Sequence, residues 1–318
     1  MIDITAIGEI LIDLTQTGIS DAGIPEYTAF PGGAPANVAV AAARLGAKTS
    51  FIGKVGNDAF GKLLVDTVKQ NGVNADGMVV SDDANTTLAV VSVAKGGERS
   101  FAFYRRGFAD TLLSKDEISE SRLSDTHFLH FGSVSLTDEP SRSATLYAVK
   151  KAKESGATVT YDPNYRASLW NGEEEAVEMM KKPMSSVDIL KISDEELPLL
   201  TGTTDSSEGT KMLSDEYGIK LILLTLGPRG AFYRFGDVTG ELPTFDVKVA
   251  DTNGAGDTFF GAFLSGMVDM KKYDPSQLNK DEIEQLITFA NKAASITTSR
   301  SGAIPAMPTL DEVMRFGV

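Results

Sequence analysis

Short apolar runs alternate with longer amphipathic segments along most of the chain. The apolar runs have the length of buried strands and stand at Ile4–Gly8, Thr49–Ile52, His127–Phe131, Thr158–Tyr161, Ile189–Ile192 and Leu221–Thr225. Segments with the spacing of amphipathic helices stand at Ala36–Leu45, Ser141–Glu154, Gly254–Met267 and Ile283–Thr297. This alternation predicts an α/β fold, with a doubly wound, mostly parallel sheet and helices on both faces. Ligands of such folds bind beyond the carboxyl ends of the strands.

One region departs from this alternation. Thr86–Ala94 and Arg99–Arg105 are rich in β-forming residues, and the segment Lys95-Gly96-Gly97-Glu98 between them has the composition of a hairpin turn. We expect the irregular stretch Thr15–Pro31 to lie against this hairpin. The sequence therefore predicts a single domain over residues 1–318, with a small β-sheet lid formed by segments at about 15–31 and 85–107.

Composition and charge exclude several classes of function. Hydrophobic residues fill 42% of the 318 positions, which is enough apolar material for a folded core. The net charge of −14 disfavours a nucleic-acid partner, whose phosphates need a basic face. No apolar run has the length of a membrane span, and the first residues lack the basic start of a signal peptide, so we expect a cytoplasmic protein without membrane contact. The absence of cysteine excludes thiolate, disulfide and iron–sulfur chemistry.

The most informative segment is Asp251-Thr252-Asn253-Gly254-Ala255-Gly256-Asp257-Thr258, which runs into an apolar helical pattern. The first amides of a helix have no intrahelical acceptor, and the helix dipole favours negative charge beside them. Small residues at this turn let a phosphate approach, and Asp257 follows where it can accept a proton from an attacking hydroxyl. Spacing alone is equally compatible with a plain glycine turn that Asp257 caps.

A second segment, Pro31-Gly32-Gly33-Ala34-Pro35-Ala36-Asn37, precedes an alanine-rich helical pattern. Its two glycines permit close approach of the backbone to a ligand, and Asn37 offers both a donor and an acceptor. Asp13, just after the first predicted strand, stands where a carboxylate can bind two sugar hydroxyls. Taken singly, a Gly-Gly pair before a helix is common, and Asp13 is equally consistent with a surface turn.

Together these segments resemble the ribokinase family, also called the phosphofructokinase-B family of carbohydrate kinases. GGAPANVAVAAARLGAKTSFIGKVGNDAFG resembles its N-terminal signature and DTNGAGDTFFGAF its C-terminal one, and the resemblance covers essentially the whole chain. It implies a ribokinase-like fold and ATP-dependent phosphorylation of a hydroxymethyl group on a sugar or nucleoside. The partners are then a small-molecule sugar and ATP.

The resemblance also implies roles for individual residues. Asp257 is the catalytic base, and the amides of Gly254, Ala255 and Gly256 form an anion hole for the transferring phosphoryl group. The implied substrate contacts are Asp13, Gly32, Gly33, Asn37, Phe103, Arg106 and Arg166. The implied nucleotide contacts are Asn164, Lys191, Ser193, Thr225, Gly227, Gly230 and Asn291.

Two metal ions follow from the same resemblance. Glu196 matches a residue that organises Mg²⁺, and we expect an indirect contact, with phosphates and water supplying the direct ligands. Ser193 replaces an asparagine that the family often carries, as fructokinases often do. Many members bind K⁺ beside the anion hole, and the matching positions are Asp251, Asn253, Thr297, Arg300, Gly302 and Ala306, the last of which is a serine in some relatives.

Within the family, RSFAFYRR followed by Ala109-Asp110, and the segment YDPNYRASLW, resemble the fructokinases. This implies transfer to fructose, giving fructose 6-phosphate. Kinases of 2-keto-3-deoxygluconate share much of both segments, and in that alternative Arg106 and Arg166 bind the carboxylate of the substrate. Another sugar or nucleoside kinase of the same family is a further alternative, and an alternative of another class is a catalytically silent protein that senses a sugar or nucleotide. Because lids in this family often pair between subunits, the resemblance also implies a homodimer formed through the lid.

Overall fold

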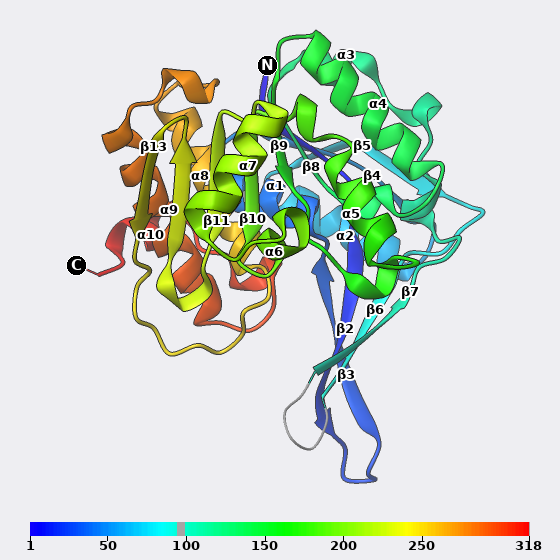
Figure 1. Ribbon diagram of the computed structural model, residues 1–318. Coiled ribbons are helices and arrows are strands. Elements are labelled where there is room, and N and C mark those ends of the chain that lie inside the picture. The colour runs from blue at the N-terminus through cyan, green and yellow to red at the C-terminus, as the bar shows by residue number, and fades with distance from the viewer. Residues whose placement is uncertain (94–98, 318) are drawn as a thin grey trace.

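The computed structural model describes residues 1–93 and 99–317. A nine-stranded sheet with the order β13-β12-β11-β10-β9-β8-β1-β4-β5 forms the centre of the body (Figure 1). Its strands are β1 (Ile2–Ile7), β4 (Thr49–Gly56), β5 (Asn74–Ser81), β8 (Thr126–Gly132), β9 (Thr158–Asp162), β10 (Ile189–Ser193), β11 (Leu221–Thr225), β12 (Ala231–Phe235) and β13 (Val238–Leu242). Neighbouring strands are parallel except at β12, which is antiparallel to both β11 and β13. The predicted mostly parallel sheet is confirmed.

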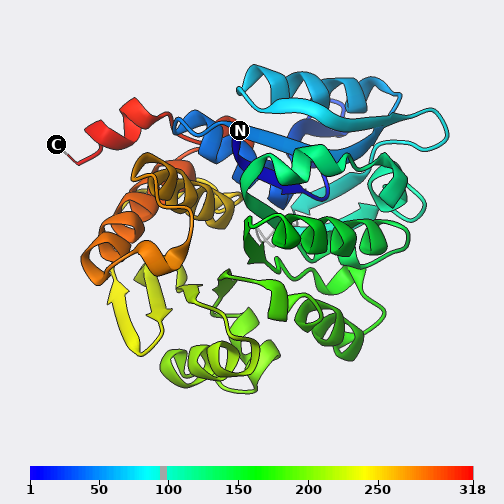
Figure 2. The ribbon, with the colours of Figure 1, turned by 90° about the horizontal axis from the view of Figure 1, so that it is seen from above.

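Helices cover both faces of this sheet (Figure 2). They are α1 (Ala34–Arg44), α2 (Ala59–Gln70), α3 (Glu120–Ser124), α4 (Ser141–Glu154), α5 (Glu173–Lys181), α6 (Glu196–Thr201), α7 (Ser206–Tyr217), α8 (Ala255–Asp269), α9 (Lys280–Thr298) and α10 (Leu310–Arg315). Helices α1, α8 and α9 pack on one face, and α4 to α7 pack on the other. Among the described residues, no helix is long and apolar enough to cross a membrane.

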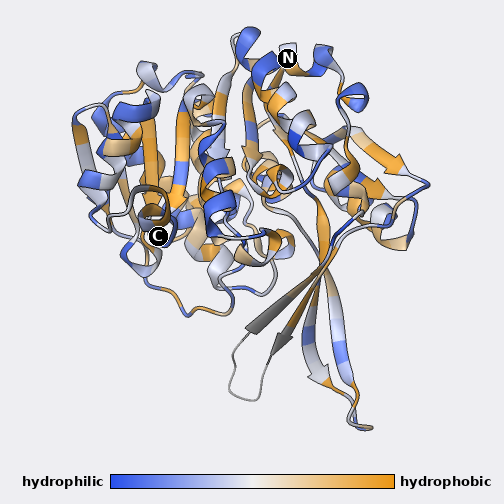
Figure 3. Ribbon diagram, turned by 45° about the vertical axis from the view of Figure 1, so that its right-hand side comes forward, coloured by the Kyte–Doolittle hydropathy of each residue, from blue (hydrophilic) through white to orange (hydrophobic). Residues whose placement is uncertain are grey.

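The strands of the body are apolar because they are covered on both faces. Phe128 of β8 packs into the cluster that contains α8 and α9, while its neighbours Leu129 and Phe131 pack into the cluster on the opposite face. The run Leu221–Leu224 of β11 is fully buried. Continuous apolar runs of this kind are typical of parallel sheets between two helical layers. Figure 3 shows the same concentration of apolar residues in the central strands.

A second sheet, which we call the lid, has four strands in the order β3-β2-β6-β7 and projects from the body (Figure 1). Its strands are β2 (Leu11–Ile19), β3 (Pro25–Gly32), β6 (Leu88–Val93) and β7 (Arg99–Tyr104). The stretch Thr15–Pro31, expected to be irregular, forms most of β2 and β3, and β2 pairs with β6. The predicted turn Lys95–Glu98 lies outside the described residues.

Candidate active site

A cavity of about 970 Å³ opens at the carboxyl ends of β9, β10 and β11, between the body and the lid. Thr15 and Val91 of the lid line one part of it, and the first turn of α8 lines another. The position agrees with the general rule for doubly wound sheets. Of the residues predicted to act in the site, the cavity is lined by Asn164, Arg166, Lys191, Ser193, Glu196, Thr225, Gly227, Gly230, Asp251, Asn253, Gly254, Ala255, Gly256, Asp257 and Asn291.

The Gly-Ala-Gly turn opens α8 as the sequence predicts. Gly254 precedes the helix with a φ of 73°, and a Cβ atom there would lie only 3.0 Å from the Cβ of Ala303. Glycine therefore suits this position both for its backbone conformation and for the available space. The amide of Ala255 donates to the carbonyl of Thr252 at 3.3 Å. The amides of Gly256 and Asp257 lie in the first helical turn, where no intrahelical acceptor exists, so they are free to bind an anion.

Two side-chain amides hold the carboxylate of Asp257. Asn37 Nδ2, on α1, donates to Asp257 Oδ2 at 2.8 Å, and Asn164 Nδ2 donates to Oδ1 at 3.4 Å. Asn164 reaches this position from a left-handed backbone conformation with a φ of 50°. Burial raises the pKa of Asp257, while Asn37, Lys191 and Asn164 act in the opposite direction. The carboxylate is thus oriented by two donors at the start of α8, beside the first-turn amides.

Asn37 has a second property that suits a sugar site. Its side chain is buried, and its Oδ1 atom has no hydrogen-bond partner among the described residues. A buried acceptor without a partner is rare in folded proteins. A hydroxyl group of a ligand is the kind of donor that would satisfy it.

A buried cation lies behind the same turn. Lys191 Nζ, on β10, donates to Asp162 Oδ2 at 2.8 Å, and a Cβ atom on Gly256 would lie 2.8 Å from that nitrogen. Burial lowers the pKa of Lys191, but the negative charges of Asp162, Glu196 and Asp257 outweigh it, and the net shift is upward. The ammonium group therefore stays charged next to the predicted anion hole.

The predicted sugar ligands converge on the same place from the N-terminal third of the chain. Asp13 lies on β2, and a Cβ atom on Gly32 would be 2.5 Å from Asp13 Oδ2. Gly33, with a φ of 114°, leads into α1 and so presents Asn37 to Asp257. Burial raises the pKa of Asp13 to about 6, and a hydrogen bond with Asn253 opposes the shift.

The three remaining predicted substrate residues differ in exposure. Arg166 is exposed and lines the cavity, where its positive charge lowers the pKa of both Asp13 and Asp257. Phe103 is partly buried on β7. Arg106 lies beyond the end of β7 and is exposed, whereas its neighbour Arg105 is buried.

Arg105 and Glu9 are buried charged residues that the sequence analysis did not select. For Arg105 a signal was available, because residues two apart in a strand point to the same face. Arg105 is two positions after Phe103 and Arg106 is three. If Phe103 has a role in the lid, the same-face rule therefore favours Arg105 over Arg106 as a second functional residue. For Glu9, a polar residue between two apolar runs in IGEILI, the sequence carries no comparable signal.

The predicted nucleotide residues line the other arm of the cavity. Thr225 ends β11, and its hydroxyl donates to the carbonyl of Ile192 at 3.3 Å. Gly227 and Gly230 follow in the next turn. Asn291, on α9, is buried and donates from Nδ2 to the carbonyl of Pro243 at 3.1 Å. Its amide group therefore also fixes the loop that leads from β13 toward α8.

The residues near Glu196 fit an indirect magnesium contact better than a direct one. Glu196 Oε1 accepts from the amide of Tyr165 at 2.8 Å, and Oε2 accepts from the amide of Ser193 at 2.8 Å. Both carboxylate oxygens are thus engaged by the protein. No cluster of three or more metal-ligating side chains exists in the described part of the chain. A Mg²⁺ ion here would take most of its ligands from phosphates and water.

The positions predicted for potassium gather around Asp251. Its Oδ1 accepts from the amide of Asn253 at 3.0 Å, and its Oδ2 accepts from the amide of Gly302 at 3.2 Å. Arg300 donates to the carbonyl of Ala306 at 3.4 Å. Thr297 is buried on α9, and its hydroxyl donates to the carbonyl of Ala293 at 3.2 Å. The carbonyl of Ala306 is the least suited of these groups to a cation, because a guanidinium group already faces it.

Comparison with known proteins assigns the class of this site. A family model described as pfkB family carbohydrate kinase matches residues 1–310, and the chain belongs to this family. It is 42% identical over 316 residues to Fructokinase-1 of Zea mays, covering 98% of this chain and 97% of that protein. The predicted family, the ribokinase-like fold and the class of enzyme, a phosphotransferase with an alcohol acceptor, are confirmed.

Two solved structures are similar over nearly their whole length. The fructokinase from Xylella fastidiosa with bound ATP has a TM-score of 0.91 and 34% sequence identity, with coverage of 98% of this chain and 97% of that one. The fructokinase from Vibrio cholerae O395 in its fructose, ADP and calcium ion bound form has a TM-score of 0.89 and 32% identity, with coverage of 99% of each chain.

Proposed function

We propose that this protein is an ATP-dependent fructokinase that transfers the γ-phosphoryl group of ATP to a hydroxymethyl group of fructose, giving fructose 6-phosphate and ADP. The observation that carries the proposal is the position of Asp257, whose carboxylate is held by Asn37 and Asn164 beside the first-turn amides of α8. The similarity to fructokinases over nearly the whole chain supports fructose as the acceptor.

The reaction assigns one task to each part of this turn. A bond forms between the fructose oxygen and the γ-phosphorus, and the bond to the bridging oxygen of ADP breaks. The hydroxyl proton passes to Asp257, which acts as the general base. The amides of the Gly254–Gly256 turn stabilise the charge that spreads over the phosphoryl oxygens, together with the dipole of α8. The amide of Gly256 is free for this task, whereas that of Ala255 has to exchange its 3.3 Å bond to the Thr252 carbonyl for the phosphoryl oxygen. Lys191 supplies a fixed positive charge beside the same turn.

We assign the sugar to the side of the cavity under the lid. The hydroxyl groups of the sugar contact Asp13, Gly32, Gly33 and Asn37. One of them would satisfy Asn37 Oδ1, the buried acceptor that has no partner among the described residues. Phe103 and Arg106 approach the sugar from the lid, and Arg166 approaches from the body. The nucleotide occupies the arm lined by Asn164, Lys191, Ser193, Thr225, Gly227, Gly230 and Asn291.

We also propose two cations. Mg²⁺ bound with ATP would neutralise charge on the phosphate oxygens, and Glu196 would position its water ligands. The residues that would hold K⁺ are Asp251 and Asn253, Thr297 near the end of α9, and Arg300, Gly302 and Ala306 in the segment after it, several of them through backbone carbonyls. A monovalent-cation requirement is checked by replacing K⁺ with a large organic cation, and equal activity in both salts would remove this assignment.

A homodimer formed through the lid and a cytoplasmic location remain predictions. The lid supports the first of them, because Ile19, Ile24, Tyr27 and Tyr104 are exposed on its strands or the turn between them. Sedimentation at micromolar concentration is the direct check, and a species of monomer mass alone would contradict the dimer.

The deciding experiment is an ADP-release assay with ATP, Mg²⁺ and K⁺ on fructose, ribose, 2-keto-3-deoxygluconate, tagatose and adenosine. We expect kcat/KM for fructose to exceed the others by about a hundredfold, roughly 2.7 kcal/mol in transition-state binding. Preference for the keto acid would replace the proposed acceptor and leave the role of Asp257 intact. Inactivity on all five, with sugar binding retained, would favour the sensor alternative. Asp257→Asn is the control, and it should lower kcat by at least about a thousandfold while ATP still binds.

A further inference from the structure

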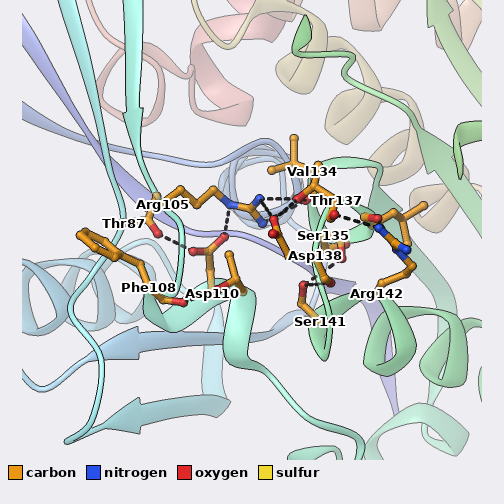
Figure 4. Close-up of polar contacts among 12 residues, drawn as sticks. Thr87, Arg105, Phe108, Asp110, Val134, Ser135, Thr137, Asp138, Ser141 and Arg142 are labelled. Atoms are coloured by element: carbon orange, nitrogen blue, oxygen red, sulfur yellow. Dashed lines mark hydrogen bonds and ion pairs between the residues drawn. The ribbon is translucent and has the colours of Figure 1, made fainter. Parts of the chain in front are cut away.

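A buried arginine lies where the lid joins the body. Arg105 directly follows β7, and its side chain is 4% exposed. Within the described residues its guanidinium group makes four hydrogen bonds, drawn as dashed lines in Figure 4. Nε donates to Asp110 Oδ2 at 2.6 Å, Nη1 donates to Thr137 Oγ1 at 2.5 Å and to Asp138 Oδ2 at 3.2 Å, and Nη2 donates to the carbonyl of Val134 at 3.0 Å.

These contacts join two lid strands to each other. Asp110 also accepts from the hydroxyl of Thr87, which immediately precedes β6. The amide of Ala109, in the segment after β7, donates at 2.9 Å to the carbonyl of Asn85, in the segment before β6. The end of β7 and the beginning of β6 are therefore fixed together through the carboxylate that pairs with Arg105.

The same guanidinium group joins the lid to the body. Val134 and Thr137 belong to the short 3-10 helix Val134–Leu136 and the residue after it, which follow the carboxyl end of β8. This is the end of the sheet at which the cavity opens. Arg142 supports the same turn, because its Nη2 donates to the carbonyl of Thr137 at 2.8 Å (Figure 4).

A third lid strand starts next to this cluster. Glu9 links β1 to β2, is buried, and accepts from the amide of Ala34 at 3.0 Å through Oε1. The positive charge of Arg105 lowers the pKa of Glu9 and the negative charge of Asp110 raises it, so both groups lie close enough to interact with Glu9. The Glu9 bond thus ties the start of β2 to the first residue of α1, directly after the predicted sugar-binding turn at Gly33.

The far part of the lid lacks comparable anchoring in the described residues. Ile19, Ile24 and Tyr27, at and near the turn between β2 and β3, are all exposed. The orientation of the whole lid over the cavity is therefore set where it joins the body, and the hydrogen bonds of the Arg105 guanidinium group lie at that junction.

We propose that Arg105 is a positioning residue, which fixes the lid at the angle that closes the sugar pocket. It acts through Phe103, two residues earlier on β7, and through β6, and it does not touch the substrate. The assignment rests on the proposed function for the identity of the sugar. Without the planar fork of Arg105, the lid adopts more open orientations. Fructose is then held less tightly, and water reaches the phosphoryl group of ATP.

The test uses a matched pair of buried arginines. Arg234 on β12 is 6% exposed and donates to Thr210 Oγ1 at 3.0 Å, the carbonyl of Ser207 at 2.8 Å and the carbonyl of Gly236 at 3.1 Å. Like Arg105 it is a buried guanidinium group with several hydrogen bonds, although the acceptors named here are neutral, and it lies near the β13 edge of the sheet, away from the lid. Arg105→Lys and Arg234→Lys both keep the charge and lose the fork.

We expect Arg105→Lys to raise the KM for fructose at least tenfold and to leave the KM for ATP within twofold. The ratio of fructose-independent ADP release to phosphoryl transfer should rise at least fivefold. Arg234→Lys should lower the thermal midpoint without moving either quantity. Thr137→Val keeps the side-chain volume nearly constant and removes the hydroxyl that accepts from Arg105 and donates to the Val134 carbonyl and to Asp138. It should shift both quantities in the same direction by two- to fivefold if Arg105→Lys does not fold.

Hydrogen exchange separates this proposal from the proposed substrate. The amides of β6 and β2 should exchange faster in Arg105→Lys and Thr137→Val than in Arg234→Lys, with no substrate present. If wild-type protein does not phosphorylate fructose, the proposed function fails and the exchange result still decides the role of Arg105. Wild-type exchange in the lid of both variants, or an unchanged KM and ATP-hydrolysis ratio in a protein that uses fructose, would overturn the proposal.

Discussion

Asn37 and Asp257 are 220 positions apart in the sequence, and Asn37 Nδ2 donates to Asp257 Oδ2 at 2.8 Å. The bond joins the two glycine-rich segments of the chain, one at the start of α1 and the other at the start of α8. The residue proposed to bind the sugar thereby also orients the proposed base. In the proposed mechanism, sugar recognition and proton transfer therefore share one side chain.

The first prediction concerns this shared residue. Asn37→Ala removes the donor that lowers the pKa of Asp257, so that pKa should rise and the acid limb of the kcat/KM profile should move to higher pH. At pH 7 we expect a loss of about ten- to a hundredfold in kcat/KM. Asn71→Ala, at the C-terminus of α2, is the control. An acid limb that stays in place would disprove the role assigned to the amide.

The second prediction follows from Asp13, whose pKa is raised to about 6 mainly by burial. Protonation removes an acceptor from the sugar, so the KM for fructose should increase as the pH falls through about 6, by up to tenfold per unit of pH. The kcat at saturating fructose should change less. Steady-state kinetics between pH 5 and about 8 measures both. Asp13→Asn should weaken binding at every pH and abolish this dependence, and a persistent titration would assign it to another group.

The third prediction compares two glycines with nearly the same backbone conformation. Gly254 has a φ of 73°, and a Cβ atom there would lie against Ala303. Gly218, after α7, has a φ of 71°, and a Cβ atom there would have no neighbour within 4 Å. Either Gly→Ala change should cost about 1–2 kcal/mol of stability through the left-handed backbone. Only Gly254→Ala should also displace the anion hole and lower kcat, by about tenfold or more. Equal kcat values in the two variants would argue against the anion hole.

The fourth prediction concerns stability. Burial raises the pKa of Glu9 from its usual 4.5 to about 7, so the folded protein binds a proton more tightly than the unfolded chain does. The resulting penalty is absent below pH 4.5, grows as the pH rises through 7, and reaches at most about 3 kcal/mol. Glu9→Gln should therefore stabilise the protein by about 1–2 kcal/mol at pH 8, and by much less at pH 5. Chemical denaturation at both pH values tests this, with the exposed Glu178→Gln as control. A gain independent of pH would contradict the explanation.

The main elements of the fold are predictable because their signals are local. Apolar runs such as Leu221–Thr225 have the length of buried strands, and the Gly-Ala-Gly turn marks the start of α8 within one residue. The stretch Thr15–Pro31 was harder, since its strands are half exposed and include a bulge between Gln16 and Gly18. Its pairing with β6 depends on contacts that are distant in the sequence.

The residues of the candidate site also divide into those with a local sequence signal and those that depend on contacts between distant segments. Asp257 and the glycines lie in contiguous motifs and are found by pattern. The proposed role of Arg105 depends on Asp110, Thr137 and Val134, which come from separate elements, so its partners are visible only in the three-dimensional arrangement. The two-residue spacing from Phe103 favours Arg105 over Arg106, and the structure adds that Arg105 is buried and Arg106 exposed.

The order of the strands has a consequence for synthesis of the protein. β1 is made first, yet it lies inside the sheet between β8 and β4, and α8 and α9 cover the face of the sheet to which its Ile4 belongs. A growing chain that has passed residue 250 already carries the lid strands, Asp13 and Asn37, but lacks the proposed base, Asp257, and its turn. By the proposed mechanism, such a chain does not transfer phosphate from ATP. The chain also exposes the apolar face of the sheet that α8 covers in the folded protein. If synthesis stalls at this point, the exposed surface is prone to aggregation and can be bound by chaperones.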